Sequence, residues 1–228
     1  VDLVIIIGGE SNHYISFEAE DMDNPYFKKG DETSISIDPL HQTAPSISGN
    51  RIVWEDYRNG NSDIYMYDLS TNAEKRITNN TAEQNDPAIY GNKIVYIDKR
   101  SGIYAIYVYD LLTNQEKKLT TITSTQRDPA IYGTNVAYVD YRNGNLDIYM
   151  YNLVTNQERR ITTNTANQYL PSIYGNKIVY YDNRNGNQNL DVYVYDLTTS
   201  TETRITNDAN NQYVPVIYNN KIVYADNR

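Results

Sequence analysis

The sequence predicts an all-β fold, namely a five-bladed β-propeller of four-stranded antiparallel blades, and three observations lead to it. A proline recurs at a spacing of 42 residues, and once of 44, from one unit to the next. Each unit contains four short runs of β-branched and aromatic residues separated by turn residues. No stretch shows the periodicity of a helix. A period near 42 with four strands per unit is typical of propeller blades.

The recurring proline opens a phrase such as Pro-Ala-Ile-Tyr-Gly, which we take as the first strand of each unit. The five prolines are Pro45, Pro87, Pro129, Pro171 and Pro215. In the first unit the next three strands are expected at 51–55, 63–69 and 74–78. Gly91-Asn92 and its counterparts suit tight hairpins between the first two strands, and Asn143-Gly144 and its counterparts supply a positive φ before the third.

Residues 1–228 are expected to form one propeller domain. Its repeats span 44–86, 87–128, 129–170 and 171–214, and a partial unit at 215–228 holds only two strands. We expect the N-terminal segment, 1–43, to supply the strand or strands that close this last blade. The reason is that Ile35 lies ten residues before Pro45, as Ile77 does before Pro87. Closure would remove the free sheet edge.

Two segments compete for the third strand of the closing blade. Residues 15–20 alternate between apolar and polar side chains, as a half-buried strand does, whereas residues 1–7 form a continuous apolar run. We prefer 15–20. An open arc of a larger ring is the alternative if the parent protein is longer.

Charge and composition exclude several classes of function. The formal net charge is -9, with 20 basic and 29 acidic side chains, so no basic face for nucleic acid is expected. The absence of cysteine excludes disulfides and thiolate chemistry. The longest apolar stretch, 1–9, is far shorter than the ~20 residues of a membrane helix, so membrane insertion is not expected. It also lacks the basic start of a signal peptide, which indicates a mature or truncated form.

The repeat phrases resemble those of a known family. Asp-x-Arg-Asn-Gly-Asn, Asp-Ile-Tyr-Met-Tyr-Asp-Leu, Arg-Ile-Thr and Pro-Ala-Ile-Tyr-Gly-Asn, over residues 32–228, resemble TolB-type propeller repeats. Such repeats occur in tandem in cell-surface proteins of methanogenic archaea and some bacteria. The resemblance implies an extracellular, cell-surface or periplasmic binding and scaffolding role, with no shared catalytic residue. Residues 17–22 also resemble the opening of some carbohydrate-binding modules, although no β-sandwich follows them.

An Asp-x-Arg pair ends the second strand of every unit, and we expect it to be structural. A pair repeated in every blade does not supply the differentiated acid and base of a single reaction, whereas each Asp can accept turn amides and bind its Arg. The pairs are Asp56 and Arg58, Asp98 and Arg100, Asp140 and Arg142, Asp182 and Arg184, and Asp226 and Arg228.

The same loop resembles a calcium loop superficially. An arginine stands where an oxygen ligand is needed, the closing glutamate is absent, and Ala105 replaces Asp63 in the second unit. His13 and His41 are too few for a histidine metal cluster. No metal and no other cofactor is therefore expected.

One glutamine lies three residues before each proline, where it should sit at one mouth of the central channel. These glutamines are Gln42, Gln84, Gln126, Gln168 and Gln212. They either bind a polar ligand or satisfy backbone groups between blades.

Departures from the repeat are the most informative positions. Trp54 replaces a tyrosine and is expected in the core, and Glu55 is an acid among apolar counterparts that could reach a cleft. Loop positions on the same face carry Tyr57, Lys99, Tyr141, Tyr169 and Tyr213. Aromatic and amide side chains on a rigid scaffold suit carbohydrate or peptide recognition, and a solvated tyrosine-rich surface is the alternative.

These observations predict a non-enzymatic propeller, extracellular or at a cell surface, that binds carbohydrate or protein or acts as a scaffold. The periplasm is an alternative compartment. The alternative function is a glycosidase-like enzyme with two or three acids at the channel mouth. Asn79-Asn80-Thr81 is a glycosylation sequon that matters only if the chain is exported.

Overall fold

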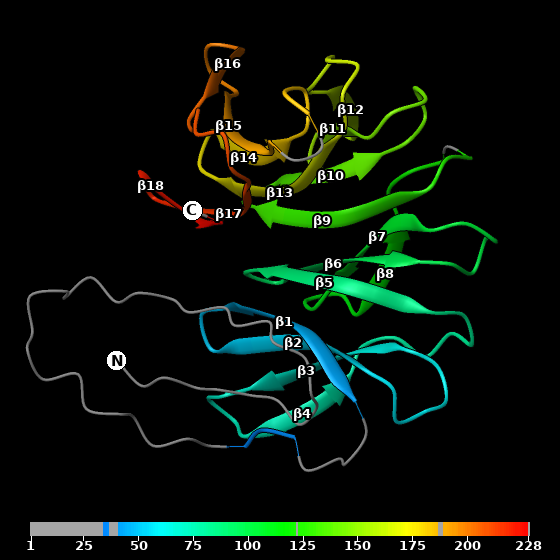
Figure 1. Ribbon diagram of the computed structural model, residues 1–228. Coiled ribbons are helices and arrows are strands. Elements are labelled where there is room, and N and C mark those ends of the chain that lie inside the picture. Colours follow the sequence, from blue (N-terminus) through cyan, green and yellow to red (C-terminus); the bar gives the residue numbers. More distant parts are fainter. Residues whose placement is uncertain (1–33, 37–40, 122, 187–188, 228) are drawn as a thin grey trace, which may run out of the picture.

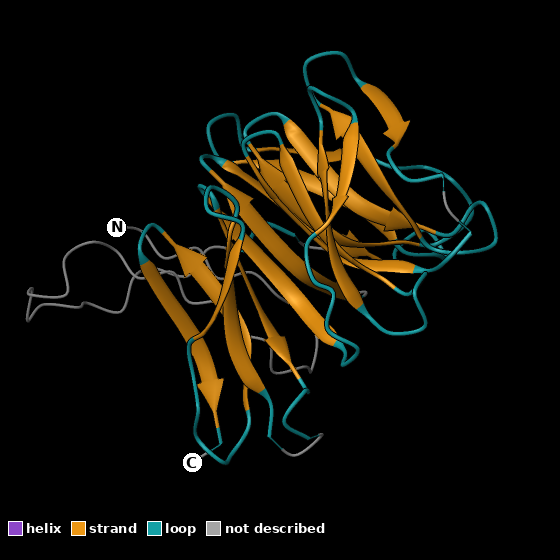
Figure 2. Ribbon diagram, turned by 90° about the horizontal axis from the view of Figure 1, so that it is seen from above, coloured by secondary structure: helices purple, strands orange, loops and turns teal. Residues whose placement is uncertain are grey.

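The computed structural model describes residues 34–36, 41–121, 123–186 and 189–227. This part of the chain consists of strands, turns and loops, as Figure 2 shows. Within it, no helix is long and apolar enough to cross a membrane.

Four four-stranded antiparallel sheets follow one another along the chain, and we call them blades 1 to 4. In each, the strands pair in sequence order. Blade 1 holds β1 (Gln42–Ser48), β2 (Arg51–Asp56), β3 (Asp63–Asp68) and β4 (Ala73–Arg76), and blade 2 holds β5 (Gln84–Tyr90), β6 (Lys93–Asp98), β7 (Ala105–Asp110) and β8 (Gln115–Lys118). Blade 3 holds β9 (Gln126–Tyr132), β10 (Asn135–Asp140), β11 (Asp147–Asn152) and β12 (Gln157–Arg160), and blade 4 holds β13 (Gln168–Tyr174), β14 (Lys177–Asp182), β15 (Asp191–Asp196) and β16 (Thr201–Arg204). Blade 5 comprises β17 (Gln212–Tyr218) and β18 (Lys221–Asp226) within the described residues. The predicted all-β class and four-stranded blades are confirmed.

The blades pack face to face in chain order, and Figure 1 shows their first strands succeeding one another from β1 to β17. Successive side chains of a strand point to opposite faces, so each blade contributes to two cores. Ile94 and Tyr96 of blade 2 pack on Val53 of blade 1, whereas Val95 packs with Tyr138 of blade 3. The apolar core therefore lies between blades, which leaves the loops to carry the surface chemistry.

The first strand of each blade is longer than the sequence analysis predicts, because it continues through a bulge. In blade 2, Gln84 pairs with Asp98, and the register then shifts before Ala88. The residue before the proline adopts a positive φ of 45 to 53° in every blade, at Ala44, Asp86, Asp128, Leu170 and Val214. Proline has no N–H for the sheet ladder, and a bulge accommodates that loss. The glutamine is thus the first residue of the strand, not a residue ahead of it.

The turn predictions are confirmed at the glycines. Gly91, between β5 and β6, has a φ of 56°, and Gly144, between β10 and β11, has a φ of 88°. A side chain is strained in this region, so glycine fits both turns.

The two ends of the described chain differ from its middle. Ile35 packs on Ile52, Trp54 and Tyr65 of blade 1. Ile77 packs on the equivalent residues of blade 2. This supports the alignment of Ile35 with Ile77. On blade 5, Val223 is 66% exposed. The predicted closing strands, 15–20 or 1–7, lie outside the described residues, so ring closure remains a prediction.

Candidate ligand-binding groove

The loops between the second and third strands are held by the Asp-x-Arg pairs. Asp98 is buried and accepts the backbone N–H of Arg100 at 2.7 Å and its guanidinium at 2.6 Å. Arg100 also binds Glu116 on β8. The same three-residue arrangement recurs in blades 1, 3 and 4: Asp56, Arg58 and Glu74; Asp140, Arg142 and Glu158; Asp182, Arg184 and Glu202. In blade 5, Arg228 lies outside the described residues.

The charge state of these aspartates follows from their contacts. Burial alone would raise the pKa of Asp56, but hydrogen bonds from Arg58 and Trp54 outweigh it and lower that pKa. Trp54 itself is buried in the core, with its indole N–H 3.0 Å from Asp56. Burial acts on Asp140 in the same way, but hydrogen bonds from Arg142 and Ser124 outweigh it and lower the pKa of Asp140. The loops of four blades are therefore built on a buried aspartate that an arginine binds.

A second buried acid starts the third strand, and its partner varies with it. Asp63 accepts from Arg76 at 2.7 Å and from Asn59 at 3.1 Å. Asp147 with Arg160, and Asp191 with Arg204, repeat the pair. In blade 2 both partners change together, to Ala105 and Lys118. Because the acid and the arginine are absent together from blade 2, we infer that the role of the acid is to bind that arginine. Within the described residues, no group of three His, Asp or Glu side chains is arranged to hold a metal ion.

The five glutamines lie under the loops between one blade and the next. All are 0 to 2% exposed. The side-chain amide of Gln168 donates to the backbone carbonyl of Ala166 at 2.7 Å and to Asp182 at 2.9 Å. Gln84 likewise donates to the carbonyl of Ala82 at 2.5 Å. These side chains face the protein interior and support the loops above them.

Glu55, near the end of β2, links blade 1 to blade 2. It is 6% exposed and accepts three hydrogen bonds: from the N–H of Asp86 at 2.7 Å, and from the hydroxyls of Thr43 at 3.0 Å and Tyr57 at 3.1 Å. The bulge brings the N–H of Asp86 to this carboxylate. Glu55 is therefore a bonded acid between two blades.

Two further acids continue this contact from blade to blade. Asp86 accepts the backbone N–H of Asp128, and Asp128 accepts that of Leu170. Burial first, and then the charges of Glu55 and Asp128, raises the pKa of Asp86 to about 7. Blade 4 has no acid at this position. We call Glu55, Asp86 and Asp128 the carboxylate ladder.

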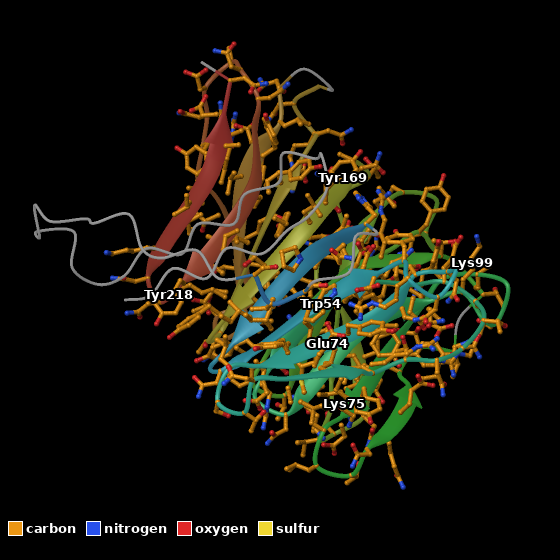
Figure 3. All side chains as sticks on the ribbon, turned by 90° about the horizontal axis from the view of Figure 1, so that it is seen from below. Trp54, Glu74, Lys75, Lys99, Tyr169 and Tyr218 are labelled. Atoms are coloured by element: carbon orange, nitrogen blue, oxygen red, sulfur yellow. The ribbon has the colours of Figure 1, made fainter. Side chains whose placement is uncertain are left out.

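A groove of about 600 Å³ opens beside the ladder, between the loops of blades 1 and 2. Its prominent side chains are two tyrosines and four polar residues: Tyr57, Tyr104, Asn61, Glu83, Asn85 and Lys99. Figure 3 shows Lys99, in the loop between β6 and β7, far from Tyr218 at the end of β17.

Three of these side chains form a compact cluster. The Tyr104 hydroxyl donates to Glu83 at 2.5 Å, and Lys99 Nζ lies 3.1 Å from the same carboxylate and 5.4 Å from the Tyr104 ring centroid. The hydrogen bonds from Tyr104 and Lys99 lower the pKa of Glu83. Burial, followed by the contact with Glu83, raises the pKa of Tyr104 to about 12. At neutral pH the groove therefore holds a matched ion pair and a neutral phenol.

Tyr57 forms the other aromatic wall. It is 37% exposed, and its ring lies 5.7 Å from that of His41. Burial first, and then the carboxylate of Glu55, raises the pKa of Tyr57 to about 12. Its hydroxyl is thus neutral and oriented by Glu55.

The groove gathers residues that break the repeat. Where blade 2 has Glu83, Lys99 and Tyr104, blade 4 has Asn167, Asn183 and Leu190. The sequence analysis singled out Glu55, Tyr57 and Lys99 but missed Glu83 and Tyr104. Comparing every repeat position, and not only the residues beside the prolines, would have revealed both.

The other predicted tyrosines lie outside this groove. Tyr141 is 54% exposed, Tyr169 stacks on Tyr181 at 4.9 Å, and the Tyr213 hydroxyl donates to Asn227 at 3.1 Å. The structure thus brings Glu55 and Tyr57 together and leaves Tyr141, Tyr169 and Tyr213 on other blades.

The sequence analysis missed a row of tyrosines at the ends of the first strands. Tyr90, Tyr132, Tyr174 and Tyr218 end the first strands of blades 2 to 5, with successive ring centroids 4.8, 4.6 and 5.1 Å apart. Blade 1 has Ser48 there, and its hydroxyl accepts the N–H of Gly91 at 3.1 Å. The row joins adjacent blades, as aromatic pairs at these distances do.

The chain was compared with known proteins. No family model matches it, and no curated protein does. Among solved structures, TolB from Acinetobacter baumannii aligns with a TM-score of 0.60 at 23% identity, over 75% of this chain and 45% of that one. A structure assigned as TolB from Agrobacterium tumefaciens gives 0.63 at 21% identity, over 79% and 67%. The structure of a nidogen/laminin complex gives 0.63 at 13% identity, over 82% and 74%.

Peptidases are also among the similar structures. A puromycin-hydrolysing peptidase from Mycobacterium tuberculosis aligns with a TM-score of 0.60 at 14% identity, over 72% of this chain but only 28% of its own. The chain thus spans less than half of the Acinetobacter TolB chain and about a quarter of the peptidase. At these identities the likeness shows the fold, which is that of a TolB-like β-propeller.

Proposed function

We propose that this propeller is a non-enzymatic binding or scaffolding module that takes a carbohydrate or protein partner in the groove between blades 1 and 2. The observation that carries the proposal is the convergence of Glu83, Lys99 and Tyr104, all departures from the repeat, on one exposed groove. The repeated residues bond to the scaffold, so the departures are the side chains available for recognition.

The bonding of the acids favours binding over catalysis. A glycosidase needs two carboxyl groups facing one substrate bond. Glu55 and Asp86 accept backbone N–H groups of neighbouring blades, and Glu83 is bound by Tyr104 and Lys99. These acids are already hydrogen-bonded within the protein, so among the described residues the glycosidase-like alternative lacks two carboxyl groups that face one substrate bond.

Partner and compartment rest on resemblance. TolB-type repeats imply an extracellular, cell-surface or periplasmic setting, and the similar nidogen structure is a complex with a second protein, laminin. The proposal places this chain in such a setting, as a module that presents its loop face to a partner.

We also propose that the N-terminal segment, 1–43, supplies the strand or strands that complete blade 5 and close the ring. The seat of Ile35 on blade 1 supports this, because Ile77 occupies the same seat directly after the last strand of blade 1. Deleting residues 1–36 should abolish cooperative unfolding, since it exposes a strand edge and an apolar face. An unchanged calorimetric transition in the shortened chain would refute closure.

Binding and catalysis are separated by incubating the protein with an oligosaccharide array and with cell-envelope proteins, then analysing retained material and products. Retention of an intact partner by the wild-type protein, reduced in the Lys99→Ala variant, supports the proposal. Cleaved product supports the enzyme alternative. If the Lys99→Ala variant retains the partner as well as the wild type does, the groove is not the binding site.

A further inference from the structure

We propose that the ligand of this groove is a neutral carbohydrate, held between the Tyr57 ring and the Lys99–Glu83 pair. The inference deepens the proposed function and rests on it. It assigns recognition roles to Glu83, Lys99 and Tyr104.

The ion pair is arranged to accept a hydroxyl group. Glu83 Oε2 accepts from both Tyr104 and Lys99, while Glu83 Oε1 accepts from none of the described residues. A lysine ammonium has three N–H donors, and here one is directed at Glu83. A sugar hydroxyl can accept from Nζ and donate to Oε1 at once, so it binds without breaking the pair. A charged ligand must separate the pair to gain its full contact.

The aromatic walls are fixed before any ligand arrives. Glu55 holds the Tyr57 hydroxyl at 3.1 Å, and Glu83 holds that of Tyr104 at 2.5 Å. The backbone N–H of Lys99 donates to the Glu83 carbonyl at 3.1 Å, which sets the two charged residues opposite each other. A preordered site loses little conformational entropy on binding. The exposed ring of Tyr57 then offers a flat surface for the C–H face of a sugar.

A polypeptide finds less in this groove. Protein hot spots need a desolvated apolar pocket, yet among the described lining residues Ala82 is the only aliphatic side chain. The lining residues other than Asn85 of β5 lie in loops, so the groove presents little strand edge to an added β-strand. The net charge of -9 opposes polyanionic glycans. Neutral carbohydrate is the class that these features favour.

The test uses the full chain and an array of neutral, sulfated and sialylated oligosaccharides, followed by titration calorimetry with the neutral sugar retained best. We expect Kd to rise at least tenfold in Lys99→Ala, Glu83→Ala and Tyr57→Ala. It should change less than twofold between 50 and 500 mM NaCl, because no net charge is neutralised. Tyr141→Ala is the matched control, since Tyr141 takes the Tyr57 position in blade 3, and it should bind as the wild type does.

Each contrary result has a distinct meaning, provided that the variants keep the wild-type melting transition. Retention of only sulfated or sialylated glycans, or equal losses in Tyr57→Ala and Tyr141→Ala, overturns the inference. If a purified envelope protein binds the wild type but not Lys99→Ala, and no sugar does, the binding function stands and the carbohydrate class falls. If neither binds, both proposals fail.

Discussion

Two equivalent sets of loops carry different side chains, charged in one and neutral amides in the other. The groove at blades 1 and 2 presents Glu83 and Lys99, whereas the corresponding hollow at blade 4, of about 610 Å³, presents Asn167 and Asn183. The amides are tied to the loops: the Asn183 side chain accepts the N–H of Asn167 at 2.8 Å, and Asn167 accepts that of Leu146 at 2.8 Å. The charged and aromatic groups of the first groove instead bond to one another and face solvent.

The difference teaches that scaffold and surface vary separately in this protein. Beneath both sets of loops lie a buried glutamine and a buried aspartate in similar contacts: Gln84 and Gln168 donate to a loop carbonyl, and Asp98 and Asp182 accept from an arginine. One blade can therefore change its loop side chains without changing its frame. If this separation holds, substitutions in the frame should lower the free energy of unfolding by similar amounts in the two blades. Substitutions in the loops should have different effects in the two blades.

The largest effect is expected from the buried aspartates of the frame. Asp98→Ala and Asp182→Ala should each lower the free energy of unfolding by about 4 kcal/mol, because each removes the buried acceptor of a turn N–H and of an arginine, which keeps its bond to a glutamate. Urea denaturation of the two variants measures the loss. A gap of more than ~1 kcal/mol between them would break the view that the frames are equivalent.

The carboxylate ladder gives the next effect, which depends on pH. In the unfolded chain Asp86 ionises near its usual pKa of 3.8, whereas burial with Glu55 and Asp128 raises the folded value to about 7. The folded state holds that proton more tightly, so its stability falls as pH rises from 4 to 7. Asn at position 86 stays neutral and tolerates the positive φ.

The variant Asp86→Asn should therefore match the wild type near pH 4 and exceed its stability at pH 8 by roughly 3 kcal/mol. Thermal melts across this range provide the measurement. Blade 4 supplies the control, since Leu170→Met at the same bulge position should change the stability by the same amount at pH 4 and at pH 8. A stability gain for Asp86→Asn that does not depend on pH would contradict the ladder.

The residues of blade 2 predict that a second substitution can restore part of an intermediate loss of stability. Asp147→Ala should cost about 2 kcal/mol, because Arg160 and Asn143 lose a buried acceptor. Adding Arg160→Lys reproduces the Ala105 and Lys118 combination of blade 2 and should restore about half of the loss. Denaturation of single and double variants gives the coupling energy. Additive costs would mean that Ala105 and Lys118 are unrelated.

Much of the frame could be predicted from the sequence, because repetition encodes it. Strand order, turn glycines and the face-to-face packing of the blades follow from a pattern that recurs at each proline. The bulge escaped because its cause is local: Pro87 cannot donate to the ladder, yet the strand continues through it to Gln84. The predicted closing strands fall in residues that the structure does not describe.

The groove was harder to predict, because its members meet across three loops. Glu83 and Tyr104 are 21 residues apart, and each departs from the repeat by itself. Sequence comparison can flag such departures, but only packing decides which of them meet. The tyrosine row was missed for the opposite reason: the tyrosine recurs in blades 2 to 5, and the contact of Tyr90 with Tyr132 depends on the distance between blades.

The smallest effect on stability, and the sharpest test of the separation, comes from exchanging the loops. Glu83→Asn with Lys99→Asn gives the groove the Asn167 and Asn183 pair of blade 4, whose hydrogen bonds run to backbone positions that blade 2 also has. The exchange removes one exposed ion pair, so stability should stay within ~0.5 kcal/mol of the wild type. Binding of the neutral sugar should nevertheless be lost in calorimetry. A large loss of stability would show that Glu83 and Lys99 belong to the frame, and their conjunction in the groove would then be a structural feature with no bearing on recognition.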